Sequence, residues 1–230
     1  MSNTLRVGLH PCSCPEPHHD RRLVAVTGGP GAGKTAVLEM ALRMFCHHVA
    51  VLPEAASVVF GGGFPRHDSD IGRRAAQRAI YHVQREMERL VLGEGRFGLA
   101  FCDRGTVDGV AYWPASPGSF WRELGTSHQA ELGRYAAVVH LRVPPPEQGY
   151  NRDYALRIES PEEALALDER IAEAWRSHPH YHEVPADPDF HRKASRALAL
   201  LHALLPPCCR EQVPIEAATQ SASTAPSVQA

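Results

Sequence analysis

The sequence predicts an α/β fold in which five parallel strands form a sheet flanked by helices. Short apolar runs alternate with longer segments of helical periodicity between residues 22 and 205. Most of these runs are apolar throughout, which is typical of strands that helices cover on both faces. The expected strands span residues 23–27, 49–53, 97–102, 136–141 and 181–185.

Helices are expected at the crossovers between these strands. The clearest start is at Ser160, because its hydroxyl can cap a helix in which Pro161 takes the first position. Glu162 and Glu163 then complement the helix dipole, and the helix should end near Trp175. The other expected helices span residues 34–46, 70–92, 119–135 and 189–205.

The two ends of the chain lack such patterns. The N-terminal end is polar and rich in Pro and His, and the C-terminal end carries small polar residues. We therefore expect disordered tails at residues 1–21 and 206–230 around a single domain at residues 22–205. No apolar segment follows a basic start, so the N-terminus does not resemble a secretory signal.

Charge and hydropathy narrow the choice of partners. The formal net charge of −2 gives no broad positive field, so nucleic-acid binding is not indicated. The longest apolar runs, such as residues 197–205, are far shorter than the roughly 20 residues that cross a bilayer. We expect a cytoplasmic protein whose partner is a small molecule. The sequence does not decide whether the chain also binds a protein partner or forms a homodimer.

The six cysteines match no standard zinc spacing. Within HPCSCPEPHH, a metal could be held by His10, Cys12, Cys14 and His18, but a single Cys-x-Cys in a Pro-rich tail is weak support. The adjacent Cys208 and Cys209 lie in the other expected tail. We therefore do not expect the cysteines to bind a metal.

A complete phosphate-binding pattern lies in TGGPGAGKT, residues 27–35. This Walker A loop follows an expected strand and opens an expected helix, which is the context that the motif requires. Lys34 can reach the β- and γ-phosphates, and the Thr35 hydroxyl can bind Mg²⁺. The pattern predicts a P-loop NTPase fold. The expected nucleotide contacts in the loop are Gly28, Gly29, Pro30, Gly31, Ala32, Gly33, Lys34 and Thr35.

Two carboxylates follow neighbouring expected strands. Asp103 comes directly after the third strand and Glu54 after the second, so both should emerge at the edge of the sheet where ligands bind. Asp103 is the best Walker B residue for Mg²⁺. One carboxylate can manage the metal while the other acts as general base, and the sequence does not decide between Glu54 and Asp103 for the base. Arg104 could pair with a phosphate or a substrate oxygen.

Three segments together resemble a known family: VLPEAASVVFGGGFPR, FCDRGTVDGVAYWP and LRIESPEEALALDERIAEAW. They are similar to the P-loop nucleoside and nucleotide kinases and, more closely, to bacterial AAA-type ATP-binding proteins related to the ribosylnicotinamide kinase domain. The likeness covers most of residues 23–204. It implies a five-stranded parallel sheet and ATP with Mg²⁺.

The same resemblance implies a small lid after the fourth strand, at residues 144–163. Arg152 and Arg157 are the lid arginines that could neutralise phosphate charge. Arg157 is preferred for this catalytic role, because Arg157-Ile158-Glu159 matches the related pattern best, and Arg152 is expected to contact the nucleotide. The triple Pro at the start of the lid departs from the pattern and should stiffen it.

The acceptor is expected between the second strand and the following helix, at residues 60–70, where Phe64 and Arg66 could contact it. Further expected contacts are Gln77, Arg78, Gln84, Asp108, Tyr112 and Trp113. These features predict a kinase that transfers the γ-phosphoryl group of ATP to a nucleoside-like or nucleotide-like acceptor. The alternative is a regulatory ATPase or nucleotide-dependent switch that acts through a protein partner.

Overall fold

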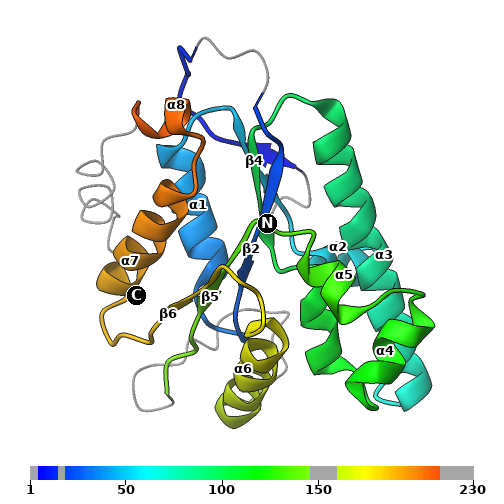
Figure 1. Cartoon of the computed structure of the whole chain (residues 1–230). Helices are drawn as coiled ribbons and strands as arrows, with labels where there is room; N and C mark the ends of the chain where they lie inside the picture. Colours follow the sequence, from blue (N-terminus) through cyan, green and yellow to red (C-terminus); the bar gives the residue numbers. More distant parts are fainter. Residues whose placement is uncertain (1–4, 15–18, 146–159, 213–230) are drawn as a thin grey trace.

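The computed structural model describes residues 5–14, 19–145 and 160–212. Its centre is a sheet of six strands in the order β1-β3-β4-β2-β5-β6 (Figure 1). All neighbouring strands run parallel except β1, which pairs antiparallel with β3. The strands are β1 (Arg6–Val7), β2 (Arg22–Thr27), β3 (Val49–Leu52), β4 (Leu99–Asp103), β5 (Ala137–Leu141) and β6 (Tyr181–Val184).

The predicted count of five strands is wrong, because β1 adds a sixth. It comes from the region that we expected to be a tail, and a strand of two residues is too short to show a pattern. Its pairing is made by the backbone, with Arg6 opposite Val51 and Val7 opposite Ala50. By pairing with β3, this short strand covers an edge that would otherwise be open to other chains.

The described helices cover both faces of the sheet. They are α1 (Lys34–Met44), α2 (Ala55–Gly61), α3 (Asp70–Glu94), the 3₁₀ helix η1 (Thr106–Tyr112), α4 (Pro117–Glu123), α5 (His128–Leu132), α6 (Pro161–Trp175), α7 (Phe190–Ala203) and α8 (Pro207–Arg210). The last of these lies in the expected C-terminal tail. None of the helices in the described part of the chain combines the length and apolarity that a bilayer crossing requires.

The start of α6 matches the sequence prediction, whereas one other expected helix is divided in two. At the start of α6, Ser160 Oγ accepts from Glu163 N at 3.2 Å, and Glu163 Oε2 accepts from Ser160 N at 2.8 Å. The expected helix at residues 119–135 is instead divided into α4 and α5. The division falls at Gly125, whose φ of 66° is left-handed, and Ser127 then caps α5.

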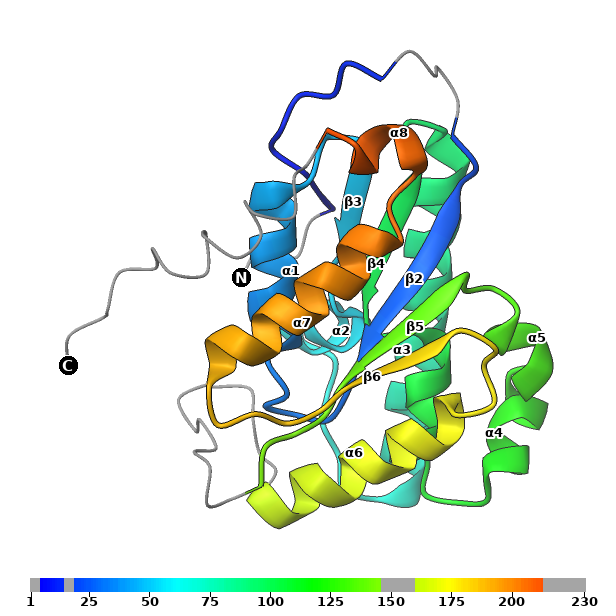
Figure 2. The same ribbon diagram turned by 60° about the vertical axis from the view of Figure 1, so that its left-hand side comes forward.

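The sheet separates two apolar cores, because alternate residues of each strand point to opposite faces. Val24 and Val26 of β2 pack with α1 and α7 on one face. Leu23 and Ala25 pack with residues of α3, η1, α4, α5 and α6 on the other. Figure 2 shows α1 and α7 next to each other on the left-hand side of β2 and β5. The continuous apolar runs in the sequence are thus explained by burial on both faces.

Candidate active site

The order and register of the strands bring the phosphate loop and the two carboxylates together. β2, which leads into the loop, lies between β4 and β5. Val26 lies opposite Asp103, and Leu52 lies opposite Cys102. Because Glu54 and Arg104 each come two residues after that second pair, they reach the same level at the carboxyl edge of the sheet.

Both the first and the last glycine of the phosphate loop are required by the backbone. Gly28 has a φ of +133°, and a Cβ there would lie 2.1 Å from the Leu141 carbonyl oxygen. Gly33 has a φ of +90°, and its Cβ would lie 2.7 Å from the Phe190 ring. The loop then leads into the N-terminus of α1, where backbone N–H groups and the helix dipole favour a phosphate.

The Lys34 side chain lies over the loop. Its Nζ donates to the carbonyl oxygens of Gly28 at 2.9 Å and Gly29 at 3.0 Å. Burial and the positive charge of Arg104 lower the pKa of Lys34 to about 8. A phosphate would replace these neutral carbonyl partners with a negative charge, so nucleotide binding should restore the ordinary pKa.

Thr35 and Asp103 form an oxygen pair beside the loop. Thr35 Oγ1 donates to Asp103 Oδ2 at 3.2 Å. Asp103 Oδ1 is buried and has no hydrogen-bond partner among the described residues. Burial and the charge of Glu54 raise the pKa of Asp103 to about 6. A hydroxyl and an orphaned carboxylate oxygen next to a phosphate loop suit Mg²⁺, which prefers oxygen ligands.

Arg104 connects the loop, Glu54 and the 3₁₀ helix. Its Nε donates to Glu54 Oε1 at 2.7 Å, and its NH1 group donates to the Gly28 carbonyl and to Asp108 Oδ2, both at 3.0 Å. The backbone φ of Arg104 is +72°, a strained value for a residue with a side chain. Such strain persists where the surrounding contacts fix the side chain, as they do here.

Glu54 stays ionised at neutral pH. Burial alone would raise its pKa, but the charges of Arg104 and Lys34 outweigh burial and lower it to about 2. Its second oxygen, Oε2, accepts from Ser57 Oγ at 2.6 Å. The Glu54 side chain remains 29% exposed, so it can still meet a ligand.

A large cavity joins the phosphate loop to the region expected to bind the acceptor. Its volume is about 1460 Å³. The residues expected to contact the acceptor that line it are Arg66, Gln77, Gln84, Asp108, Tyr112 and Trp113. Phe64 is absent from the described lining of the cavity, whereas Phe60 is part of it. Arg66 Cζ lies 4.0 Å from the centroid of the Phe60 ring. Arg78 points elsewhere and pairs with Glu123 at 2.9 Å.

Two further predicted site residues belong to the expected lid. Arg152 and Arg157 lie outside the described residues, which resume at Ser160. Their expected contacts with the nucleotide and the phosphoryl group therefore stay predictions.

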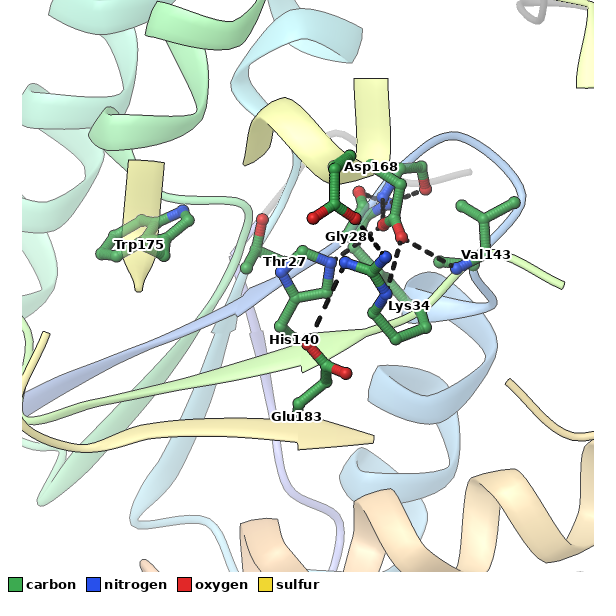
Figure 3. A network of polar contacts seen from close by, with 12 residues as sticks. Thr27, Gly28, Lys34, His140, Val143, Asp168, Trp175 and Glu183 are labelled. Carbon is green, nitrogen blue, oxygen red and sulfur yellow. Dashed lines mark hydrogen bonds and ion pairs between the residues drawn. The ribbon is translucent and has the colours of Figure 1, made fainter. Parts of the chain in front are cut away.

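Asp168 on α6 is a buried anchor of the phosphate loop that the sequence analysis missed (Figure 3). Its Oδ1 accepts from Gly29 N at 2.7 Å and from His140 Nε2 at 2.9 Å. Its Oδ2 accepts from Val143 N at 3.3 Å and pairs with Arg142 Nε at 3.2 Å. A signal was present, because Asp168 lies between apolar residues on the buried face of an amphipathic helix.

Two further buried side chains form hydrogen bonds with the loop or with the residue that precedes it. Lys193 on α7 donates to the Ala32 carbonyl at 2.8 Å. Asp108 accepts from Thr27 Oγ1 and from Trp175 Nε1, each at 2.7 Å. Asp108 is thus committed to protein partners, although it borders the cavity.

Comparison with known proteins supports the fold. A family model described as AAA domain matches residues 23–192. A crystal structure of NadR protein in complex with NR has a TM-score of 0.59 and 17% identity, over 80% of this chain and 52% of that one. A crystal structure of NadR protein in complex with NAD and AMP-PNP has a TM-score of 0.53 and 16% identity, over 80% of this chain and 49% of that one.

The chain thus spans about half the length of these solved structures. At such identities the likeness shows a shared fold. No curated protein sequence matches the chain.

Proposed function

The chain belongs to the AAA domain family, and from this premise we propose that it is a kinase that transfers the γ-phosphoryl group of ATP to a small-molecule acceptor. Family membership and the shared fold confirm the predicted resemblance to the P-loop kinase-like group. The acceptor that we propose is nucleoside-like or nucleotide-like, as the sequence analysis expected.

The observation that carries the proposal is the size and position of the cavity. Its volume of about 1460 Å³ exceeds the roughly 300–1,000 Å³ of a site for one small ligand. It extends from the phosphate loop past Glu54 to Gln77 and Tyr112. A switch needs room for its nucleotide, whereas a kinase needs a second compartment that meets the γ-phosphate.

The nucleotide side would use the loop and its two flanking side chains. Lys34 would turn from the loop carbonyls to the phosphate oxygens, and the backbone N–H groups at the start of α1 would bind the β-phosphate. Thr35 and Asp103 would hold Mg²⁺. When bound, the metal would neutralise negative charge on the phosphates.

The acceptor side would use Glu54 and Arg104. Glu54 is ionised and partly exposed to the cavity, so we assign to it the role of orienting the acceptor hydroxyl and accepting its proton. A pKa of about 2 makes Glu54 a weak base, and phosphoryl transfer through a loose transition state tolerates a weak base because little proton transfer has to precede it. Arg104 holds the carboxylate in place. Arg157 and Arg152 are proposed to approach the phosphates from the lid.

The test is ADP release from Mg-ATP with and without a panel of nucleosides, nucleotides and NR, the ligand in the NadR structure. We expect one acceptor class to stimulate release, with a phosphorylated product seen by mass spectrometry. Glu54→Gln should lower the stimulated rate by about 10²–10⁴-fold while ATP still binds. Glu169→Gln removes an exposed carboxylate on α6 and should leave the rate unchanged. A slow rate that no acceptor changes would contradict the kinase and favour the switch.

A further inference from the structure

We propose that Cys14, His19, His48 and Cys209 bind one zinc ion at the edge of the sheet opposite the phosphate loop. Among the described residues, two overlapping groups of four Cys and His side chains have ligand atoms within 4.8 Å of one another. Cys14 and Cys209 belong to both groups. The spacing of residues in the sequence did not predict this set of four, because its ligands come from three segments that are far apart in the chain.

The distances match the edges of one tetrahedron. With Zn–N of about 2.05 Å and Zn–S of about 2.3 Å, neighbouring ligand atoms lie about 3.3 Å apart for two nitrogens and about 3.6 Å for nitrogen and sulfur. His19 Nε2 and His48 Nδ1 are 3.3 Å apart. Cys14 Sγ lies 3.4 Å from the first nitrogen and 3.6 Å from the second. Cys209 Sγ lies 3.9 Å and 3.6 Å from them.

The sixth edge joins the two sulfurs, Cys14 Sγ and Cys209 Sγ, which lie within 4.8 Å of each other. Two thiolates and two neutral imidazoles are the Cys₂His₂ set that zinc binds in closed structural sites. A disulfide explains the cluster less well, since Cys209 Sγ lies 3.9 Å from Cys12 Sγ and 4.0 Å from Cys208 Sγ. A disulfide bond is about 2.05 Å long.

The position of the site indicates a structural role. His48 directly precedes β3, so it lies at the amino ends of the parallel strands, whereas the phosphate loop lies at the carboxyl end of β2. Cys209 is in α8, which Figure 2 shows at the opposite end of the molecule from α6. A metal here would tie the N-terminal segment and α8 to the main domain.

The backbone already holds two of the segments together. Leu9 N donates to the Leu42 carbonyl at 2.9 Å, and His47 N donates to the His10 carbonyl at 3.0 Å. The site is therefore partly organised before metal binds, and this reduces the entropy that binding must overcome. Cys12 and Cys208 flank the four ligands and are not part of the proposed set.

Metal content of the purified 230-residue chain tests the proposal. Mass spectrometry of metals should give about one zinc per chain, and chelation should lower Tm. Cys14→Ser and Cys209→Ser should each lose most of the zinc. Cys102→Ala, which removes a buried cysteine of β4, and His82→Ala on the exposed face of α3 should keep it.

If the variants fail to fold, X-ray absorption at the zinc edge of the unmodified chain identifies the atoms bound to the metal. We expect two sulfurs at about 2.3 Å and two nitrogens at about 2.05 Å. A chain without zinc after growth and refolding in zinc would overturn the proposal. Three or four sulfur neighbours, or loss of zinc in Cys12→Ser but not in Cys14→Ser, would overturn the assigned ligand set.

Discussion

Replacing Asp168 with Asn should loosen the phosphate loop at its deepest contact. The side chain is buried and faces four donors, two at each oxygen. Asn keeps the shape but offers one acceptor oxygen. Its NH₂ group must face either Gly29 N and His140 or Val143 N and Arg142, where a donor would oppose donors.

The expected loss in the free energy of unfolding follows from the number of hydrogen bonds that lose their acceptor. A hydrogen bond to a charged group contributes about 1.5–3 kcal/mol, so losing two costs roughly 3–6 kcal/mol. We expect the lower end, about 3 kcal/mol, because the Arg142 side chain is 24% exposed and also pairs with Glu169. Native proteins have about 5–15 kcal/mol of stability in all. For a chain of this size, 3 kcal/mol corresponds to a fall in Tm of roughly 6–12 °C.

Equilibrium unfolding in urea measures the change, with binding of AMP-PNP as the second readout. Glu169→Gln is the matched control, since it neutralises the next carboxylate of α6, which is 57% exposed. It should change stability by less than about 0.5 kcal/mol. If Asp168→Asn is as stable as Glu169→Gln and binds AMP-PNP equally well, the anchoring argument is refuted.

The same variant makes a prediction about pH. Burial would raise the pKa of Asp168, but the interactions with His140, the Gly29 backbone N–H and the Arg142 charge together outweigh burial and hold the pKa below its ordinary value of 3.8. A carboxyl group with a lowered folded-state pKa stabilises the fold above its unfolded pKa and loses that effect as pH falls through the folded value. The difference between parent and Asp168→Asn should therefore persist at pH 5 to 7, roughly, and shrink below about pH 4.

Four other substitutions test the phosphate loop, the start of α6 and the end of α3. Affinity for AMP-PNP should fall as pH rises through about 8, because Lys34 then loses its proton in the free protein, and Lys34→Arg should abolish this dependence in a titration by calorimetry. Ser160→Ala should cost about 1 kcal/mol in urea unfolding, since it removes the α6 cap, and an unchanged midpoint would contradict the capping box. Gly28→Ala should abolish AMP-PNP binding, because its Cβ would clash with a carbonyl oxygen, whereas Gly93→Ala in α3 meets nothing within 4 Å and should stabilise the chain by about 0.5–1 kcal/mol.

Local patterns explain which parts of the fold were predictable. The apolar runs placed β2 to β6, and the Ser160 signature placed the start of α6, because periodicity and capping act over a few residues. The edge strand β1 and the break between α4 and α5 were missed. A two-residue strand is stabilised by its partner β3, and a left-handed Gly125 can be recognised only from the backbone.

The location of the phosphate loop, Glu54, Asp103 and Arg104 at one edge of the sheet could be predicted from sequence, because each lies within two residues of the carboxyl end of a strand and parallel strands end at one edge. The contacts between these side chains could not be predicted from the sequence. That Arg104 holds Glu54, while Thr35 meets Asp103, depends on the strand order and on a register that no local pattern specifies.

The sequence by itself therefore determined the fold class and which residues lie beside the glycine-rich loop at the carboxyl edge of the sheet, since spacing within a short segment fixes loop shape and strand ends. Tertiary structure alone decided that Asp168 reaches Gly29, 139 positions away, and that Cys14 meets His48 and Cys209. The physical reason is that such contacts depend on how whole elements pack. A buried acid on a helix or a cysteine near a chain end acquires its partner only when the sheet has assembled.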